Sequence, residues 1–294
     1  MITADQLVKH FGSLCAVNGV SFQIRRGECF GLLGPNGAGK STTIHMLIGL
    51  TIPDRGRVEV AGASPSLAAT RRMIGAAPQT LSLYEELTAR ENLTFFGRLF
   101  GLSGATLRQR VEWALDLADL QSRSRHRVST YSGGMKRRLN IAIALIHNPQ
   151  VLLLDEPTVG VDPQSRNYIF ETIERLKSDG LTILYTTHYM EEAQRLCDRL
   201  AIMDQGQVLA EGSVPDLLQQ YGGKKVVTAQ VCERPSALLL PGTIHNDQLR
   251  FETTQPVEDL ARLIDQGASF HSIQIAEPDL ECVFLALTGK SLRD

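Results

Sequence analysis

Residues 34–42 read Gly34-Pro35-Asn36-Gly37-Ala38-Gly39-Lys40-Ser41-Thr42, and this glycine-rich segment is the strongest indicator of the fold. An apolar run at residues 29–33 precedes it and a helix-like segment at residues 42–50 follows it, so the predicted order is strand, glycine loop, helix. This order is the setting that a phosphate-binding P-loop requires. The glycines let the backbone curl around an anion without Cβ clashes, and the N–H groups of the turn then point at the phosphates.

The side chains that close this stretch predict a nucleoside triphosphate site. We expect Lys40 to reach the β and γ phosphates and the Ser41 hydroxyl to ligate Mg²⁺. A chance glycine turn before a helix is the alternative, but the pattern G-x-x-x-x-G-K-[ST] should arise by accident roughly once per hundred sequences of this size. The motif indicates a nucleotide site and no particular reaction.

Length and composition bound the class of protein. A chain of 294 residues predicts one or two domains. Its 43% hydrophobic and 21% charged residues are typical of a soluble globular protein. The formal net charge of -2 provides no overall basic field, and the short basic clusters at residues 123–127 and 136–138 are better interpreted as solvated faces, phosphate contacts or partner contacts. We therefore expect no nucleic-acid partner.

The cysteines and the apolar runs predict the cellular compartment. None of the five cysteines shows metal-ligand spacing, which favours a reduced, cytosolic protein. Residues 1–9 lack the apolar core of a signal peptide. No uninterrupted apolar run approaches the ~20 residues that span a bilayer. If the protein works at a membrane, another chain must supply the spanning part.

The order of predicted elements indicates an α/β fold. Short strands are expected at residues 7–9, 16–24 and 29–33, with antiparallel pairing suggested by the turns between them. Helical periodicity runs from about residue 85 to residue 147. Residues 151–154 are all apolar, which predicts a strand in the middle of a parallel sheet. The β-α alternation that follows predicts an open sheet with its ligand at the carboxyl ends of the strands.

A composition break at residues 221–225 predicts a boundary between two domains, 1–221 and 222–294. The second domain is expected to hold three strands and two helices. In its last helix, apolar residues recur at i, i+3, i+4 and i+7, which are Leu280, Val283, Phe284 and Leu287. Because the opposite face lacks basic residues, a packing stripe of a small α/β domain is favoured over a membrane-surface helix.

Two carboxylates follow the apolar strand at residues 151–154. Asp155 is placed to hold Mg²⁺ through water, and Glu156 to act as the general base that deprotonates an attacking water. Taken alone, an ordinary acidic turn at a strand end explains them equally well. Together with the glycine loop, they predict a metal–phosphate site.

A second glycine motif, Ser132-Gly133-Gly134, opens a predicted helix upstream of these carboxylates, and it resembles the signature motif of ABC-type ATPases. The resemblance extends over roughly residues 3–220 and includes Gln79 after a strand, Asp162 in a Val-Asp-Pro turn, and His188 after the next strand. It implies a P-loop NTPase of ABC type: a parallel core sheet, an antiparallel β subdomain, a helical insert at about 85–147, and a small C-terminal α/β domain.

The resemblance gives each matching position a role in ATP binding and hydrolysis. Phe11 takes the place of the aromatic residue, more often tyrosine, that stacks on adenine. Gln79 would contact Mg²⁺ and the γ-phosphate and lie beside the surface that touches a membrane partner. His188 would hold the γ-phosphate and water. The residues at 132–134 would present a hydroxyl, N–H groups and a helix N-terminus to a nucleotide held by a second copy, and Asp162 is counted among the nucleotide-binding positions.

In this family two nucleotides are sandwiched head to tail between two chains, so the resemblance implies a second copy or a paralogous ATPase subunit as partner. ATP closes the dimer and hydrolysis reopens it. The implied protein is the ATPase subunit of an exporter that drives a separate integral membrane permease. It would be cytoplasmic and bound to the inner face of the cell membrane through that permease.

Details of the motifs favour one branch of the family. Met135 stands where glutamine is usual, and Tyr131 where leucine is usual. These variants and the tail at residues 277–289 resemble the daunorubicin-resistance-like exporters.

A soluble ABC ATPase that acts on nucleic acid or ribosomes is the alternative, although this chain has one motif set, a short helical insert and no basic stripe. A P-loop kinase or GTPase would share only the glycine loop and Asp155. The transported substrate stays open.

Overall fold

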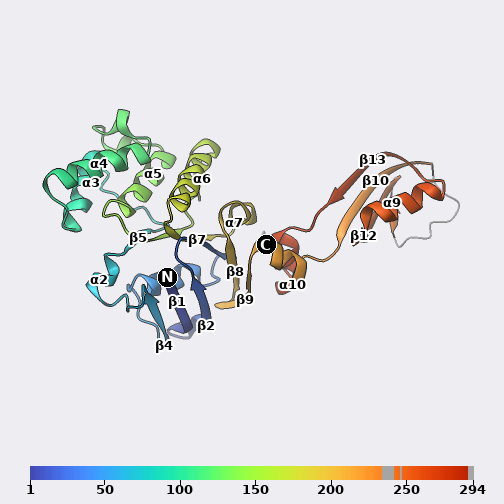
Figure 1. The fold of residues 1–294 in the computed structure, drawn as a ribbon, viewed down its shortest axis with the longest axis horizontal. Coiled ribbons are helices and arrows are strands. Elements are labelled where there is room, and N and C mark those ends of the chain that lie inside the picture. The colour runs from blue at the N-terminus through green and yellow to red at the C-terminus, as the bar shows by residue number, and fades with distance from the viewer. Residues whose placement is uncertain (234–241, 246, 291–294) are drawn as a thin grey trace. The chain divides into compact units, whose positions relative to one another are not determined.

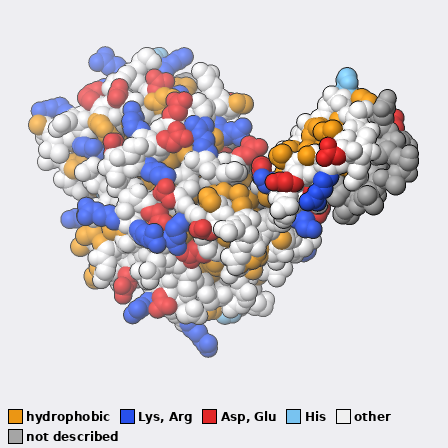
Figure 2. Space-filling view, turned by 45° about the vertical axis from the view of Figure 1, so that its right-hand side comes forward, with side chains coloured by type: hydrophobic (Ala, Val, Ile, Leu, Met, Phe, Trp, Pro, Cys, Tyr) orange, Lys and Arg blue, Asp and Glu red, His pale blue; other side chains and the backbone are white. Residues whose placement is uncertain are grey.

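The computed structural model describes residues 1–233, 242–245 and 247–290. The chain forms two compact units, Met1–Ser213 and Val214–Asp294 (Figure 1). Basic and acidic side chains are interspersed on the face shown in Figure 2, in keeping with a net charge of -2. In the ranges given above, no helix combines the length and the apolarity needed to cross a bilayer.

A six-stranded sheet forms the core of the first unit, in the order β5-β6-β7-β3-β8-β9. Its strands are β3 (Cys29–Leu33), β5 (Ile74–Ala77), β6 (Val151–Asp155), β7 (Thr182–Thr187), β8 (Arg199–Asp204) and β9 (Gln207–Gly212). All neighbours pair in parallel except β8 and β9. The interior position predicted for residues 151–154 is confirmed, because β6 lies between β5 and β7 and is buried along its whole length.

Three further strands form the antiparallel β subdomain. They are β1 (Ile2–Phe11), β2 (Leu14–Ile24) and β4 (Arg55–Val60), in the order β2-β1-β4. The prediction of antiparallel pairing is confirmed for β1 and β2 but is wrong for β3, which pairs in parallel with β7 and β8. Every residue of β3 is buried, so this strand needs cover on both faces, which a central place in the core sheet supplies.

Helices cover the core sheet and form the predicted insert. The insert holds α3 (Ala89–Leu99), α4 (Gly104–Leu117) and α5 (Gly133–Ala144), with short 3₁₀ helices at Gln121–Arg123 and Val128–Thr130. Thr88 and Glu91 form a capping box that fixes the start of α3. The other helices of the unit are α1 (Lys40–Leu47), α2 (Ala68–Arg71), α6 (Pro163–Ser178) and α7 (Met190–Leu196). The predicted class, an α/β P-loop fold with an antiparallel subdomain and a helical insert, is therefore confirmed.

The second unit has its own antiparallel sheet, in the order β11-β12-β10-β13. Its elements are α8 (Val214–Tyr221), β10 (Lys225–Glu233), β11 (Thr243–His245), β12 (Gln248–Thr253), α9 (Pro256–Asp265), β13 (Ser269–Ala276) and α10 (Leu280–Thr288). The unit begins at Val214 rather than after Tyr221, because α8, which the sequence reading did not anticipate, packs against α10. In α10 the predicted stripe buries Leu280, Val283 and Phe284.

Candidate active site

The glycine loop joins β3 to α1 at the carboxyl end of the core sheet. A Cβ atom at Gly34 would lie 2.2 Å from the carbonyl oxygen of Met203, so close packing requires glycine there. Gly37 and Gly39 have φ angles of +83° and +99°, in the region that glycine adopts most readily. A Cβ at Gly37 would meet no atom within 4 Å. The loop is therefore packed tightly at its base and is open at its tip, where an anion can approach the backbone.

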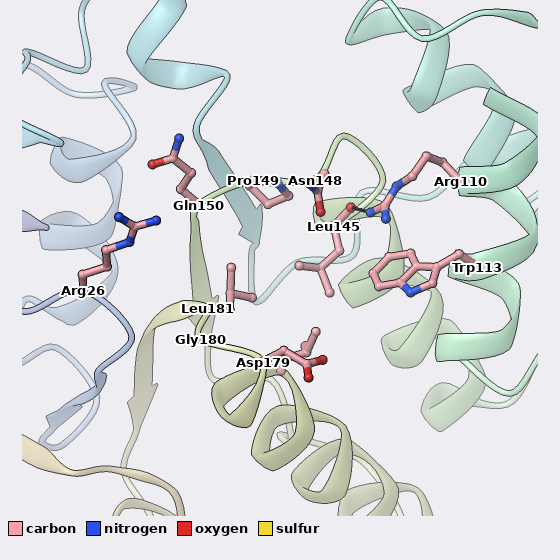
Figure 3. Close-up of a pocket in the computed structure, with 11 residues that line it drawn as sticks. Arg26, Arg110, Trp113, Leu145, Asn148, Pro149, Gln150, Asp179, Gly180 and Leu181 are labelled. Carbon is pink, nitrogen blue, oxygen red and sulfur yellow. Dashed lines mark hydrogen bonds between the residues drawn. The ribbon is translucent and has the colours of Figure 1, made fainter. Parts of the chain in front are cut away.

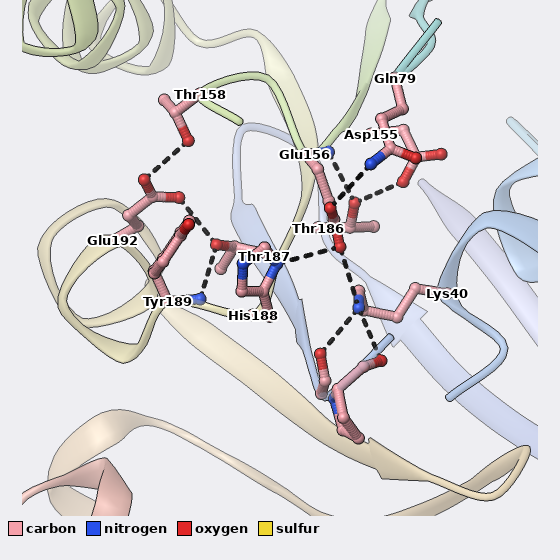
Figure 4. Close-up of polar contacts among 12 residues, drawn as sticks. Lys40, Gln79, Asp155, Glu156, Thr158, Thr186, Thr187, His188, Tyr189 and Glu192 are labelled. Atoms are coloured by element: carbon pink, nitrogen blue, oxygen red, sulfur yellow. Dashed lines mark hydrogen bonds and ion pairs between the residues drawn. The ribbon is translucent and has the colours of Figure 1, made fainter. Parts of the chain in front are cut away.

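Lys40, the first residue of α1, has a buried ammonium group. Its Nζ donates hydrogen bonds to the carbonyl oxygens of Gly34, at 2.7 Å, and Pro35, at 3.0 Å. The same atom lies 3.1 Å from Oε1 of Glu156, and both side chains of this ion pair are less than 10% exposed. A buried charge needs such partners, because desolvation without them is costly. The lysine thus rests directly against the predicted base (Figure 4).

Glu156 is the point at which the predicted catalytic residues meet (Figure 4). Gln79 donates from Nε2 to Oε2 of Glu156 at 3.1 Å. Nδ1 of His188 lies 3.3 Å from Oε1, although it makes no hydrogen bond in this geometry. Glu156 itself has a φ of +46°, which is uncommon for a residue other than glycine. The structure therefore brings together Lys40, Gln79, Glu156 and His188 from four separate segments.

Thr186 orients both carboxylates and was missed by sequence reasoning. Its hydroxyl donates to Oδ1 of Asp155 at 2.7 Å and accepts a hydrogen bond from the backbone N–H of Glu156 at 3.0 Å. Strand pairing could have identified Thr186, because Asp155 at the end of β6 pairs with Thr186 near the end of β7. One threonine on a neighbouring strand thus fixes the direction of Asp155 and the unusual backbone of Glu156.

The donor set at this end of the sheet suits Mg²⁺. Asp155 offers a buried carboxylate, Ser41 a hydroxyl and Gln79 an amide oxygen, and hard oxygen atoms of this kind are the ligands that Mg²⁺ prefers. The nucleotide requires an open loop tip and a lysine, and both are present.

Arg137, on α5, is a second residue that sequence reasoning did not place correctly. It was expected to lie on a solvated face or at a contact, but it is only 5% exposed. Its guanidinium donates to the carbonyl oxygens of Pro78 and Gln79, both at 3.0 Å. Burial lowers the pKa of Arg137, and the nearby Asp155 carboxylate opposes this effect. The helix that begins at residue 133 therefore holds the backbone of the Gln79 segment.

The signature residues lie at the start of α5, beside the Asp162 turn. Ser132 is the N-cap, and its hydroxyl accepts a hydrogen bond from the N–H of Met135. A Cβ at Gly134 would lie 2.1 Å from Oγ of Ser165. Asp162 caps α6 by accepting from the N–H of Ser165, and this bond lowers the pKa of Asp162. In the described ranges, no hydrogen bond or ion pair joins residues 132–134 to the cluster around Glu156.

Phe11 lies apart from that cluster as well. It ends β1 and its side chain is 53% exposed. Nζ of Lys9 lies 5.8 Å from the centre of its ring. The exposed position is compatible with the stacking role expected for Phe11, which stays a prediction.

Comparisons with known proteins agree with this site. The family model described as ABC transporter matches residues 17–159. The chain is 42% identical to the linearmycin resistance ATP-binding protein LnrL of Bacillus subtilis (strain 168), with all of both chains covered. It is 44% identical to the Nod factor export ATP-binding protein I of Bradyrhizobium diazoefficiens (strain JCM 10833), over 97% of this chain and 95% of that protein.

Solved structures give the same answer. An ATP-binding subunit of an ABC transporter superposes with a TM-score of 0.69 at 34% identity, over 76% of this chain and 93% of the other. The cassette MJ0796, as a dimer in a post-hydrolysis state with ADP and Pi, superposes with a TM-score of 0.67 at 29% identity, over 72% of this chain and 98% of the other. The chain therefore belongs to the ABC transporter family and is an ATP-binding, ATP-hydrolysing subunit of the exporter type.

Proposed function

We propose that this chain closes as a head-to-tail dimer on ATP and thereby drives a separate membrane permease in export. The observation that carries the proposal is the division of the site into two parts. Lys40, Gln79, Glu156 and His188 converge at one place, whereas residues 132–134 lie beside Asp162 and have no described bond to them. A site divided in this way is completed when a second copy lays its Ser-Gly-Gly segment over the nucleotide.

The residues around Glu156 supply the chemistry of hydrolysis. When ATP binds, its phosphates replace Glu156 as the partner of Lys40, and the freed carboxylate can accept a proton from the attacking water. His188 and Gln79 hold the water and the γ-phosphate on either side of that carboxylate. Ser41, Gln79 and Asp155 would hold Mg²⁺, which would supply positive charge to neutralise the phosphates. Loss of the γ-phosphate removes the ligand that the two copies share, and the dimer opens.

A groove beside Gln79 supports the permease as partner. Its volume is about 320 Å³, and it lies between α1, β5, α3 and α5. Most of its lining is apolar, and two of its leucines are highly exposed, Leu99 at 69% and Leu50 at 74%. An exposed apolar groove of this kind fits the apolar face of a short helix. We assign the groove to a cytoplasmic helix of the permease, because the relatives named above are export and resistance proteins.

The groove is continuous with the catalytic cluster. Pro78 lines it, and the next residue is Gln79, whose amide donates to Glu156. Asp155 also reaches its lining. A permease helix that shifts in the groove would therefore move Gln79 relative to Glu156. This movement would couple ATP hydrolysis to the conformation of the permease. Through this contact the chain would sit at the inner face of the membrane.

The experiment that tests the proposal is Glu156→Gln. Because the amide cannot take a proton, ATP turnover should fall by ~10²–10⁴ while ATP binding persists and the closed dimer accumulates. Turnover is measured by phosphate release, binding by calorimetry, and dimerisation by light scattering with Mg²⁺ and ATP.

Glu174→Gln is the matched control, because this glutamate forms an exposed ion pair with Arg195 away from the site. It should leave turnover and dimerisation unchanged. Hydrolysis by Glu156→Gln within a few-fold of the wild type would remove Glu156 from the role of base. A protein that stays monomeric with ATP in the presence of the permease would refute the clamp.

A further inference from the structure

Glu192, on α7, is a buried carboxylate to which the mechanism above gives no task. It is 3% exposed, and no lysine or arginine among the described residues forms an ion pair with it. Instead it accepts three hydroxyl hydrogen bonds. Those from Thr158 and Thr187, both at 2.7 Å, are drawn in Figure 4. The third comes from Tyr185 at 2.9 Å. Three donors on one carboxylate satisfy a charge that burial would otherwise penalise.

The hydroxyl groups come from the segments that carry the two central catalytic residues. Thr158 is two positions after Glu156, in the turn where the N–H of Val161 bonds to the carbonyl oxygen of Thr158. Thr187 immediately precedes His188, and its hydroxyl also accepts a hydrogen bond from the N–H of Tyr189 at 2.9 Å. The backbone on both sides of His188 is therefore tied to Glu192 through one threonine.

This arrangement needs a carboxylate rather than any polar group. A carboxylate only accepts, so all three hydroxyls must point their protons at it, and the lone pair of Thr187 stays free for Tyr189. An amide at position 192 would turn one acceptor into a donor. At least one of the three hydroxyls would then have to accept a hydrogen bond from residue 192 instead of donating one. If that hydroxyl were Thr187, the new donor would compete with the N–H of Tyr189 for its oxygen.

We propose that Glu192 is a positioning residue for ATP hydrolysis, which holds the turn after Glu156 and the backbone around His188 in one fixed arrangement. It acts through His188 and Glu156, whose facing atoms are 3.3 Å apart, and touches neither nucleotide nor water itself. The inference rests on the catalytic roles given to these two residues under the proposed function. The competing explanation is that Glu192 only anchors α7.

The test is Glu192→Gln in the full chain, with Glu191→Gln as the matched control on the exposed neighbouring position. Since small displacements of catalytic groups are costly, kcat for ATP should fall by ~10-fold while KM changes by less than ~2-fold. In a His188→Ala background the same substitution should lower kcat by a clearly smaller factor, ~3-fold or less, because one of the two groups through which Glu192 acts is already missing. Glu191→Gln should change neither constant.

Three results would overturn the proposal: an unchanged kcat, an equal loss of kcat with and without His188, or a rise in KM alone. Thr187→Val provides an independent route if Glu192→Gln folds poorly, since it removes the hydroxyl bridge at nearly constant volume and should show the same dependence on His188. Normal hydrolysis by Glu156→Gln would instead refute the proposed base. In that case the effect of Glu192→Gln on kcat could still be compared with and without His188. Failure of the proposed base and failure of the proposed role of Glu192 would therefore give different results.

Discussion

The two ends of the core sheet belong to the same strands but hold different kinds of polar groups. At the carboxyl end, Oε1 of Glu156 lies 3.1 Å from Nζ of Lys40 and 3.3 Å from Nδ1 of His188, and the three residues come from three segments. At the amino end, a cavity of about 360 Å³ opens where Gln150 precedes β6 and Leu181 precedes β7 (Figure 3). Both regions are rich in polar side chains, and the cavity at the amino end is similar in volume to the groove beside Gln79.

The difference lies in what the polar groups are bound to. At the amino end, Arg110 donates to the carbonyl oxygens of Leu145 and Ile146, which directly follow α5, and its guanidinium lies 3.9 Å from the centre of the Trp113 ring. These contacts give the arginine a structural role, which is to bind carbonyl groups at the end of a helix. At the carboxyl end, by contrast, a lysine and a histidine both face one carboxylate. Convergent titratable groups, rather than the size of a hollow, locate the chemistry.

Lys40→Ala should give the largest effect, a loss of ATP affinity, if the nucleotide site lies at the carboxyl end of the sheet. It removes the charge that faces the β and γ phosphates, so ATP affinity should fall by at least ~10²-fold. Arg26→Ala, at the rim of the amino-end cavity, is the matched control and should leave affinity unchanged. Calorimetry checks both variants. Micromolar ATP affinity retained by Lys40→Ala, or lost by Arg26→Ala, would contradict the placement of the nucleotide site at the carboxyl end of the core sheet.

Arg110→Ala tests whether the amino end of the sheet contributes to stability rather than to catalysis. The variant leaves two helix carbonyl groups without their donor, so the free energy of unfolding should fall by about 2 kcal/mol. Turnover by the folded protein at 25 °C should stay within two-fold of the wild type. Urea denaturation and phosphate release measure the two quantities, with exposed Arg108→Ala on the same helix as control. A large loss of turnover without a loss of stability would place chemistry at the amino end.

His147 gives the smallest expected effect, and it depends on pH. Its Nε2 lies 3.1 Å from the carbonyl oxygen of Ile74, at the amino end of β5, and burial lowers its pKa below 6.5. The unfolded chain therefore binds this proton more readily than the folded chain, and stability falls as pH drops below about 6.5 toward the folded pKa. This loss is absent above pH 6.5.

His147→Gln should reduce that pH dependence, because the amide can still donate to Ile74 but cannot titrate. Between pH 7.5 and pH 5.5 the melting temperature of the variant should fall by about 2 °C less than that of the wild type. Differential scanning calorimetry at both pH values makes the measurement. Equal pH dependence in the two proteins would show that His147 does not supply this proton.

Sequence alone could predict the parts of the fold and site that are set locally. The glycine loop needs φ angles and close contacts that few residues other than glycine allow, so its sequence predicts its conformation without a structure. The apolar strand at residues 151–154 requires burial on both faces, which the core sheet provides. Asp155 and Glu156 follow from their place directly after that strand.

The tertiary structure alone decided which distant side chains meet. Gln79 and Glu156 are separated by 77 positions, and Thr186 reaches both carboxylates only because β7 lies beside β6. The sheet in which β3 pairs, the burial of Arg137 and the three hydroxyl bonds of Glu192 also depend on long-range packing. A sequence encodes local backbone geometry residue by residue, whereas strand order and helix packing result from the whole chain minimising its exposed apolar surface.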